Sequence, residues 1–214
     1  EGKIENWERY IKRYGGIASW QELKRVHQND GPGKQHVIAH LFGEALFNVE
    51  SIDGIDACDD SFAFGCFHSF LGKAIEVKGI EIVADLDKKC MSNLKEQGLG
   101  CQHGIGHGIV ADFGYSYEDL IKSLEICDNL ATKDPIGGCF GGVFMEYNLR
   151  TILDDKAGLR EFNPLNPYDP CPRLKDKFRP ACYYWQTQWW ENSANKDEKV
   201  KYNQIGLLCS EIDK

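Results

Sequence analysis

The sequence predicts an all-α protein of stacked helical hairpins, and three observations support this prediction. Apolar residues recur at helical spacing along most of the 214-residue chain, and almost no segment alternates like a strand. Eight of the nine cysteines fall into consecutive pairs with similar short separations. The second cysteine of each pair begins a helical segment, and these segments recur about every 35–43 residues, a spacing typical of α-helical repeats. Such units form either an open repeat array or a compact α-bundle.

The composition is that of an ordinary globular chain. Hydrophobic residues make up 42% and charged residues 27% of the sequence, so we expect one domain, residues 1–214, with a substantial core. The formal net charge of −8 argues against nucleic acid or an anionic membrane as the main partner. No apolar run approaches the roughly 18–20 residues that cross a bilayer, so no membrane insertion of this chain is expected. The chain begins at Glu1 without a methionine or a signal-peptide pattern, so we expect a mature or trimmed form, and whether a leader or anchor was removed stays open.

The first part of the chain divides at turns rich in glycine and proline. Residues 1–33 predict an N-terminal cap of two helical segments, because an apolar stripe through Trp7 and Ile11 is interrupted at Gly15-Gly16. Residues 34–150 then hold the histidine-bearing repeats. Helices are expected over 35–49, from Gly65 to Glu76, over 80–97, from Cys101 towards Asp112, from an N-cap at Ser116 to Cys127, and from Cys139 onward.

Two segments follow residue 150. Five prolines between residues 164 and 180 predict a mostly extended excursion over 151–180. Residues 181–214 predict a C-terminal aromatic repeat and a last helix near 202–212. Aromatic residues at helical spacing most often belong to a core, and a groove or partner-facing surface is the alternative for Tyr183, Tyr184, Trp185, Trp189 and Trp190.

The cysteines indicate four local disulfides. No C-x-x-C motif occurs, which argues against zinc-ribbon, thioredoxin-type and c-type haem sites. Disulfides imply an oxidising, extracytoplasmic compartment, meaning secreted, periplasmic or cell-surface. Buried free thiols in a cytosolic protein are the alternative. The expected pairs are Cys58–Cys66, Cys90–Cys101, Cys127–Cys139 and Cys171–Cys182, with Cys209 left over.

One stretch resembles a known repeat family. Ala57-Cys58, seven further residues and then Cys66-Phe-His-Ser-Phe-Leu-Gly72 are similar to the Sel1-like repeats of cysteine-rich secreted bacterial proteins. The resemblance extends over about residues 50–210, although the later loops are longer and glycine-rich motifs replace the alanines usual in the family. It implies α/α hairpins of the tetratricopeptide class, each clamped by a disulfide, and a role as an interaction scaffold.

Five of the six histidines occupy the same two positions of the repeat. Counted from the cysteine that begins each helix, they stand two and six residues on, and Lys34 takes the cysteine place in the first copy. Positions two, six and ten share one helical face, because each step of four residues turns the helix by only about 40°. Three inner helices therefore present one shared set of polar side chains, namely His36, His40, Glu44, His68, Glu76, His103 and His107.

This register predicts a transition-metal site. Imidazole with carboxylate suits zinc, copper or iron and does not suit magnesium or calcium. The expected ligands are His36, His40, His68, His103, His107 and Glu76. Copper or zinc is favoured in an oxidising compartment, and iron follows. Two other interpretations remain, a hydrogen-bonded polar seam between repeats and a metal-free pH-sensing cluster.

Glycines are frequent beside these histidines. Gly104, Gly106 and Gly108 lie in an expected helix, where each costs roughly 0.5–1 kcal/mol relative to alanine. A favourable interaction must offset that cost. The two candidates are close packing of one helix against another and an ion bound near the backbone.

Two carboxylates are candidates for catalysis. Glu146 lies beside the histidine positions of the fourth unit, where Gly141 and Met145 replace histidine, and Glu44 lies at position ten of the first unit. A carboxylate beside a metal-bound water is a common general base. If the protein is an enzyme, metal-assisted hydrolysis or copper or iron redox chemistry fits best, because H-E-x-x-H, phosphate-loop, dinucleotide and nucleophile-elbow motifs are absent. The rival hypothesis is a non-catalytic secreted scaffold, or an accessory subunit of a cell-surface complex, that binds a protein partner through an aromatic and acidic face.

Overall fold

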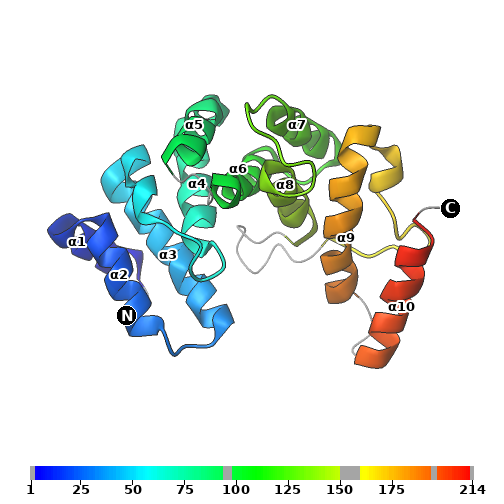
Figure 1. Ribbon diagram of the computed structural model, residues 1–214, viewed down its shortest axis with the longest axis horizontal. Coiled ribbons are helices and arrows are strands. Elements are labelled where there is room, and N and C mark those ends of the chain that lie inside the picture. Colours follow the sequence, from blue (N-terminus) through cyan, green and yellow to red (C-terminus); the bar gives the residue numbers. More distant parts are fainter. Residues whose placement is uncertain (1–2, 94–97, 150–159, 194–196, 213–214) are drawn as a thin grey trace.

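The computed structural model describes residues 3–93, 98–149, 160–193 and 197–212. Every regular element in this part of the chain is a helix, which confirms the all-α prediction (Figure 1). None of these helices is both long enough and apolar enough to cross a bilayer. The α-helices are α1 (Ile4–Tyr14), α2 (Gly16–His27), α3 (Pro32–Glu50), α4 (Gly65–Lys78), α5 (Val83–Asn93), α6 (Gly98–Phe113), α7 (Tyr117–Asp128), α8 (Gly138–Leu149), α9 (Arg179–Ser193) and α10 (Glu198–Ser210).

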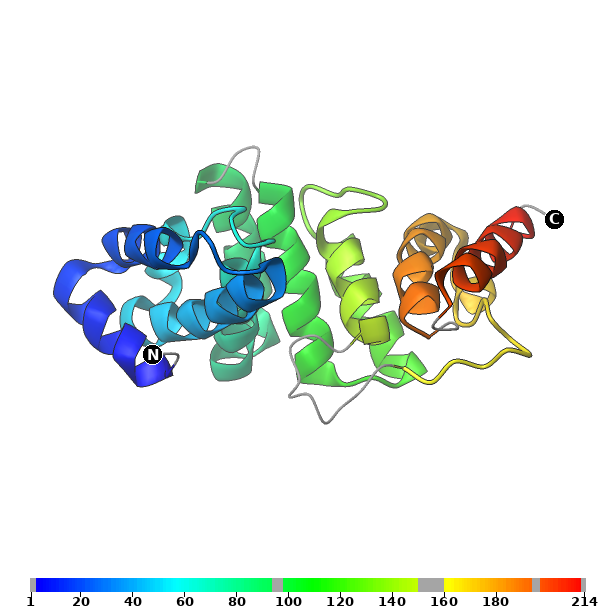
Figure 2. The same ribbon diagram turned by 90° about the horizontal axis from the view of Figure 1, so that it is seen from below.

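The helices form a row of inner helices with outer helices beside them. The inner helices α3, α4, α6, α8 and α9 pack against one another in chain order, and α6 has its largest contacts with α8 and α4. The outer helices α1, α5 and α7 pack on α3, α6 and α8 respectively. Figure 1 shows this order along the long axis of the molecule, and Figure 2 shows α6 and α8 lying side by side. Rings on the inner helices, such as Phe42, Phe67 and Phe144, are fully buried, and the Phe42 ring packs against Trp7 of α1 and Trp20 of α2.

Four disulfides fasten the outer elements to the inner helices. The pairs are those predicted, Cys58–Cys66, Cys90–Cys101, Cys127–Cys139 and Cys171–Cys182, and Cys209 is free and exposed. The second cysteine of each pair lies within the first turns of α4, α6, α8 or α9. Each bond therefore closes a short loop beside an inner helix, a constraint that contributes about 2–3 kcal/mol in the loop-entropy interpretation.

Glycines let the backbones of α6 and α8 approach closely. A Cβ atom at Gly106 in α6 would overlap the carbonyl oxygen of Cys139 in α8, and a Cβ atom at Gly142 in α8 would overlap the carbonyl oxygen of His103. Only glycine fits at such contacts between helices. Close helix packing therefore explains the helix-interior glycines of α6.

Local signals end and begin the helices as expected. Gly15 has a φ of 79° between α1 and α2, a left-handed conformation that glycine adopts without steric cost. Ser116 caps α7, because its side-chain oxygen accepts a hydrogen bond of 3.1 Å from the backbone N–H of Asp119.

The proline-rich excursion packs against α9. Residues 151–159 lie outside the described part of the chain, and residues 160–178 contain turns and two short 3-10 helices, Cys171–Arg173 and Asp176–Phe178. The indole N–H of Trp189 donates to the carbonyl of Arg160 at 2.7 Å, and that of Trp190 donates to the carbonyl of Pro167 at 2.9 Å. Both tryptophans are buried core residues, whereas Tyr184 on the same helix is 59% exposed.

Candidate metal centre

The structure brings five histidines together from three inner helices. His36 and His40 belong to α3, His68 to α4, and His103 and His107 to α6. They form two groups of three with His68 common to both, and within each group the candidate ligand atoms lie within 4.8 Å of one another. The repeat register therefore predicted which histidines meet.

The two histidines of α3 face each other through their Nε2 atoms. These atoms are 3.0 Å apart. The Nδ1 atom of His36 lies 2.9 Å from the carbonyl oxygen of Phe62. A carbonyl only accepts hydrogen bonds, so Nδ1 of His36 donates and its Nε2 keeps a lone pair directed at His40.

The Phe62 carbonyl belongs to a strained segment. Phe62, Ala63 and Phe64 have φ values of 55°, 53° and 60° directly before α4. Three consecutive non-glycine residues in the left-handed region cost on the order of 1 kcal/mol each. Such strain is concentrated at functional sites. Here it accompanies the loop that orients His36.

The two histidines of α6 repeat this arrangement with a carboxylate as the outer partner. Their Nε2 atoms are 3.1 Å apart. The Nδ1 atom of His107 lies 2.8 Å from Oε2 of Glu146 on α8, and both side chains are completely buried. The hydroxyl of Tyr115 donates to the other carboxylate oxygen of Glu146 at 2.7 Å. A carboxylate that orients a metal-ligating histidine in this way is common in metal sites.

His68 lies between the two pairs. Its side chain is buried at 4% exposure, and neither ring nitrogen has a hydrogen-bond partner among the residues that the structure describes. Its ring centroid is 5.3 Å and 5.4 Å from those of His36 and His40, and 5.6 Å and 4.6 Å from those of His103 and His107. Burying polar atoms without partners costs free energy, so this ring requires an explanation.

Burial keeps three imidazoles of this centre neutral, those of His40, His68 and His103. It lowers the pKa of His40 and of His103 to about 3, and neighbouring imidazoles add to the shift. The pKa of His68 lies well below its ordinary value for the same reasons. Neutral imidazole is the form that binds metal ions.

The spacing within each pair matches that of ligands on one ion. Two nitrogens that each bind a tetrahedral ion at 2.0–2.1 Å lie roughly 3.3 Å apart. The observed separations of 3.0 Å and 3.1 Å are close to this value. The two histidines of each pair can thus bind one transition-metal ion close to their present spacing, with His68 as the third candidate ligand within 4.8 Å.

A cavity of about 470 Å³ opens beside the histidines. Three helices each contribute one histidine to its lining, namely His36, His68 and His103. Its other walls are largely apolar and include Phe64, Leu99, Met145 and Trp185. A small molecule in this cavity would therefore contact residues of both histidine groups.

Gly141 explains why the fourth repeat has no histidine at position two. A Cβ atom there would lie 3.0 Å from Nδ1 of His103 and 2.9 Å from the Trp185 ring. The Trp185 ring packs on His103 with centroids 5.2 Å apart, and its indole N–H donates to the carbonyl of Ile136 at 2.7 Å. The fourth repeat thus forms the wall of the centre and leaves room for the His103 ring.

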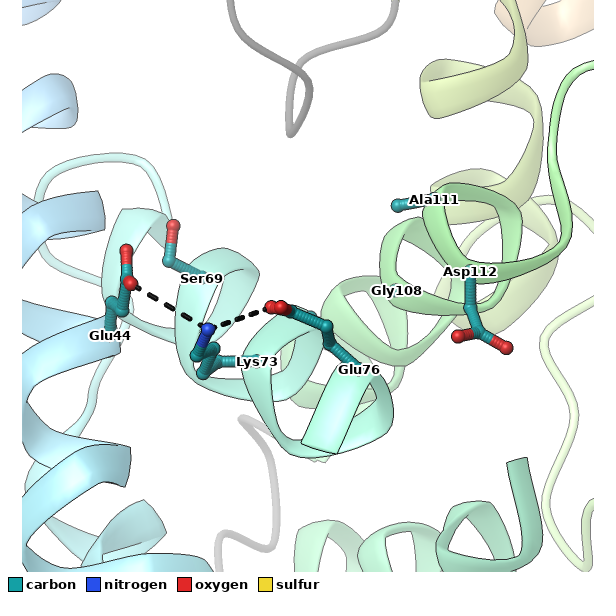
Figure 3. A pocket seen from close by; sticks show the side chains of 8 residues that line it. Glu44, Ser69, Lys73, Glu76, Gly108, Ala111 and Asp112 are labelled. Carbon is teal, nitrogen blue, oxygen red and sulfur yellow. Dashed lines mark hydrogen bonds and ion pairs between the residues drawn. The ribbon is translucent and has the colours of Figure 1, made fainter. Parts of the chain in front are cut away.

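Glu44 and Glu76 do not join the histidines. They flank Lys73 in a separate pocket of about 340 Å³, where Figure 3 shows them reaching its ammonium group from opposite sides. Oε2 of Glu76 accepts a hydrogen bond of 2.9 Å from Lys73, and Oε1 of Glu44 is 3.9 Å from the same nitrogen. Glu76 was expected as a ligand, but it belongs to neither histidine group, and its side chain is 66% exposed. The physical reason is that position ten lies a further helical turn along the axis, where Lys73 offers a nearer partner.

Sequence reasoning did not identify three groups that support the centre. They are the carbonyl of Phe62, the hydroxyl of Tyr115 and the ring of Trp185, none of which lies in the histidine register. The sequence does indicate Glu146, as a candidate general base, and the structure places it as the hydrogen-bond partner of His107. The left-handed segment Phe62-Ala63-Phe64 before α4 contains no glycine or asparagine, the residues that would have predicted this conformation from the sequence.

Comparison with known proteins adds no assignment. No protein-family model matches the chain, and neither a curated protein nor a solved structure matches it significantly.

Proposed function

We propose that this protein binds a transition-metal ion at the histidine centre and works outside the cytoplasm. The observation that carries the proposal is His68, a buried ring whose two nitrogens lack partners and whose neighbours are two histidine pairs at ligand spacing. A bound ion would supply the missing partner. A packed polar seam would instead leave this ring unsatisfied.

The ligand set favours copper or zinc, with iron next. Neutral imidazoles bind all three metals, whereas magnesium and calcium require oxygen ligands. The cysteines do not compete with the histidines for the metal ion, because eight are in disulfides and Cys209 is exposed on α10. The same disulfides support an oxidising compartment such as the periplasm or the cell surface.

Three imidazoles leave a coordination position open. Catalytic zinc sites typically have three protein ligands and one position for water or substrate, whereas structural sites have four protein ligands. The cavity beside His36, His68 and His103 gives a small molecule access to that position. An enzyme using this position would carry out metal-assisted hydrolysis or copper or iron redox chemistry.

Metal analysis tests this proposal. Untagged protein, as purified and after reconstitution, should contain at least one equivalent of copper, zinc or iron by plasma mass spectrometry. His68→Ala should lose most of it, because both groups lose a ligand. His27→Ala is the matched control, since His27 lies outside both groups and pairs with Asp30 at 2.6 Å. A folded wild-type protein that stays free of metal after reconstitution refutes the proposal.

A second candidate is an interaction scaffold of the Sel1-like kind. Several large apolar side chains are exposed, including Tyr184 on α9 and Tyr202 and Leu207 on α10. Exposed apolar residues that gather in one region often mark a protein-binding surface. If metal analysis is negative, substitution of these residues should abolish the capture of a partner while the fold is retained.

A further inference from the structure

The five imidazoles are spread over more space than one ion can occupy. His36 and His40 meet His68 on one side, and His103 and His107 meet the same His68 on the other. Within 4.8 Å the five ligand atoms divide into these two groups of three and do not form one group of five. An ion with bonds of 2.0–2.1 Å reaches ligand atoms at most roughly 4.2 Å apart, so five atoms that do not all lie within 4.8 Å of one another cannot bind one ion.

His68 is the only residue common to both groups, and it has two ring nitrogens to offer. Both nitrogens are buried and have no partner in the described part of the chain. Helix α4, which carries His68, packs against α3 on one side and α6 on the other. A single ion would satisfy one nitrogen of this ring and leave the second buried and unpaired.

We infer that the centre holds two transition-metal ions and that the imidazole of His68 bridges them. One ion takes His36, His40 and one nitrogen of His68, and the other takes His103, His107 and the second nitrogen. This inference rests on the proposed function and adds to it a second ion and a bridging ligand.

Each half of this centre has its own outer partner. The carbonyl of Phe62 accepts from Nδ1 of His36, and the carboxylate of Glu146 accepts from Nδ1 of His107. Both contacts leave the Nε2 atom of the ring directed at the other histidine of its pair. Outer partners of this kind fix the direction of the lone pair that a histidine offers to a metal ion. Because each histidine pair has its own outer partner, each pair is oriented separately, as two ions would require.

Bridging changes the protonation of one ring. The neutral imidazole of His68 carries a single N–H. When both nitrogens bind metal, this N–H bond breaks, the proton passes to solvent, and each nitrogen donates one electron pair to one ion. No electron is transferred, so the step needs no oxidant or reductant.

The bridged pair would be open to small molecules from one side. The adjacent cavity is lined by one histidine of the first pair, the bridging ring and one histidine of the second pair. Each ion has three imidazoles and one free position. A ligand in the cavity could therefore bind either ion or both.

The first test is a count of bound metal. Chelator-treated protein is titrated with Cu²⁺, and separately with Zn²⁺, and bound ions are counted by native mass spectrometry. We expect two ions per chain in the wild type and one in each of the variants His36→Ala/His40→Ala and His103→Ala/His107→Ala. Circular dichroism and intact-mass measurement of the four disulfides show that each variant is folded.

The second test detects the bridge itself. Two Cu²⁺ ions joined by an imidazolate couple magnetically, so the wild type with two ions should show far less integrated electron paramagnetic resonance signal than two isolated Cu²⁺ ions give. Each half-site variant should show the full signal of one Cu²⁺. The wild-type measurement needs no substitution and remains decisive if a variant fails to fold.

The outcomes separate the two proposals. A wild type that binds no ion refutes the metal site itself. One ion per chain leaves the metal site in place and overturns the dinuclear centre. Two ions with the full signal of two independent Cu²⁺ ions overturn the bridge.

Discussion

At the scale of single residues, the centre depends on the orientation of its rings. His107 is held by Glu146 at 2.8 Å, and Glu146 is held in turn by the hydroxyl of Tyr115 at 2.7 Å. A buried carboxylate in this position both fixes the tautomer of the imidazole and makes its other nitrogen a stronger electron donor. Glu146 is therefore a positioning residue for the proposed site, where it would act on a bound metal ion through His107.

Replacing Glu146 tests this role. Glu146→Gln keeps the shape of the side chain and removes its charge, so metal affinity should fall about 10- to 100-fold. A competition titration against a chelator of known affinity measures the change. Glu118→Gln is the control, because Glu118 is exposed and belongs to α7, which carries none of the five histidines. An affinity within twofold of the wild type would show that Glu146 does not orient a ligand.

At the scale of elements, the spacing of the inner helices is set by small residues. Direct backbone contact at Gly106 and Gly142 brings α6 and α8 close enough for Glu146 to reach His107. The disulfides Cys90–Cys101 and Cys127–Cys139 fasten the first turns of the same two helices. The packing of α6 against α8 therefore also sets the geometry of the site, since the imidazole of His107 lies on α6 and the carboxylate of Glu146 lies on α8.

An alanine substitution separates packing from helix propensity. Gly106→Ala should lower the free energy of unfolding by about 1–3 kcal/mol, because the added methyl overlaps the backbone of α8. Gly206→Ala in α10 is the matched control. Outside the backbone of α10 and the neighbouring residues, no described atom lies within 4 Å of a Cβ there, so Gly206→Ala should stabilise by about 0.5–1 kcal/mol. Denaturant unfolding with the disulfides intact measures both, and equal effects would show that α6 and α8 are not in close contact.

At the scale of the whole molecule, burial of neutral histidines makes stability depend on pH. The pKa of His40 and of His103 is about 3 in the folded protein, against roughly 6.5 for an unfolded chain. Below about pH 6.5 the unfolded chain therefore binds protons that the folded protein does not. The contribution of these two neutral rings to the free energy of unfolding is fully present above pH 6.5 and is lost as the pH falls towards 3.

Chelator-treated protein should show this loss directly. Its free energy of unfolding should decrease from pH 7.5 to pH 5, a window in which ordinary carboxylates stay mostly ionised. Denaturant unfolding at several pH values measures the slope. His40→Gln should flatten it, and His27→Gln, outside both histidine groups, should keep a slope close to that of the wild type. A wild-type stability that is constant over this window would contradict the buried neutral centre.

Much of the fold follows from short-range patterns. Helical periodicity, the break at Gly15 and the cap at Ser116 act over a few residues, so the chain alone indicates them. Disulfides of short separation follow as well, because each joins neighbours along the chain. The five histidines could be grouped because a helix of known pitch converts their spacing into one face.

The helices, the disulfide pairs and the face that carries the histidines can all be predicted from the chain, because each depends on local geometry. Which carboxylate meets which imidazole depends instead on how the helices pack. Glu76 has the correct register and turns to Lys73, whereas Glu146 is 39 residues from His107 and reaches it because glycines bring α8 against α6. Contacts of this kind depend on the separation and rotation of packed helices, quantities set by the whole core and not by any one segment.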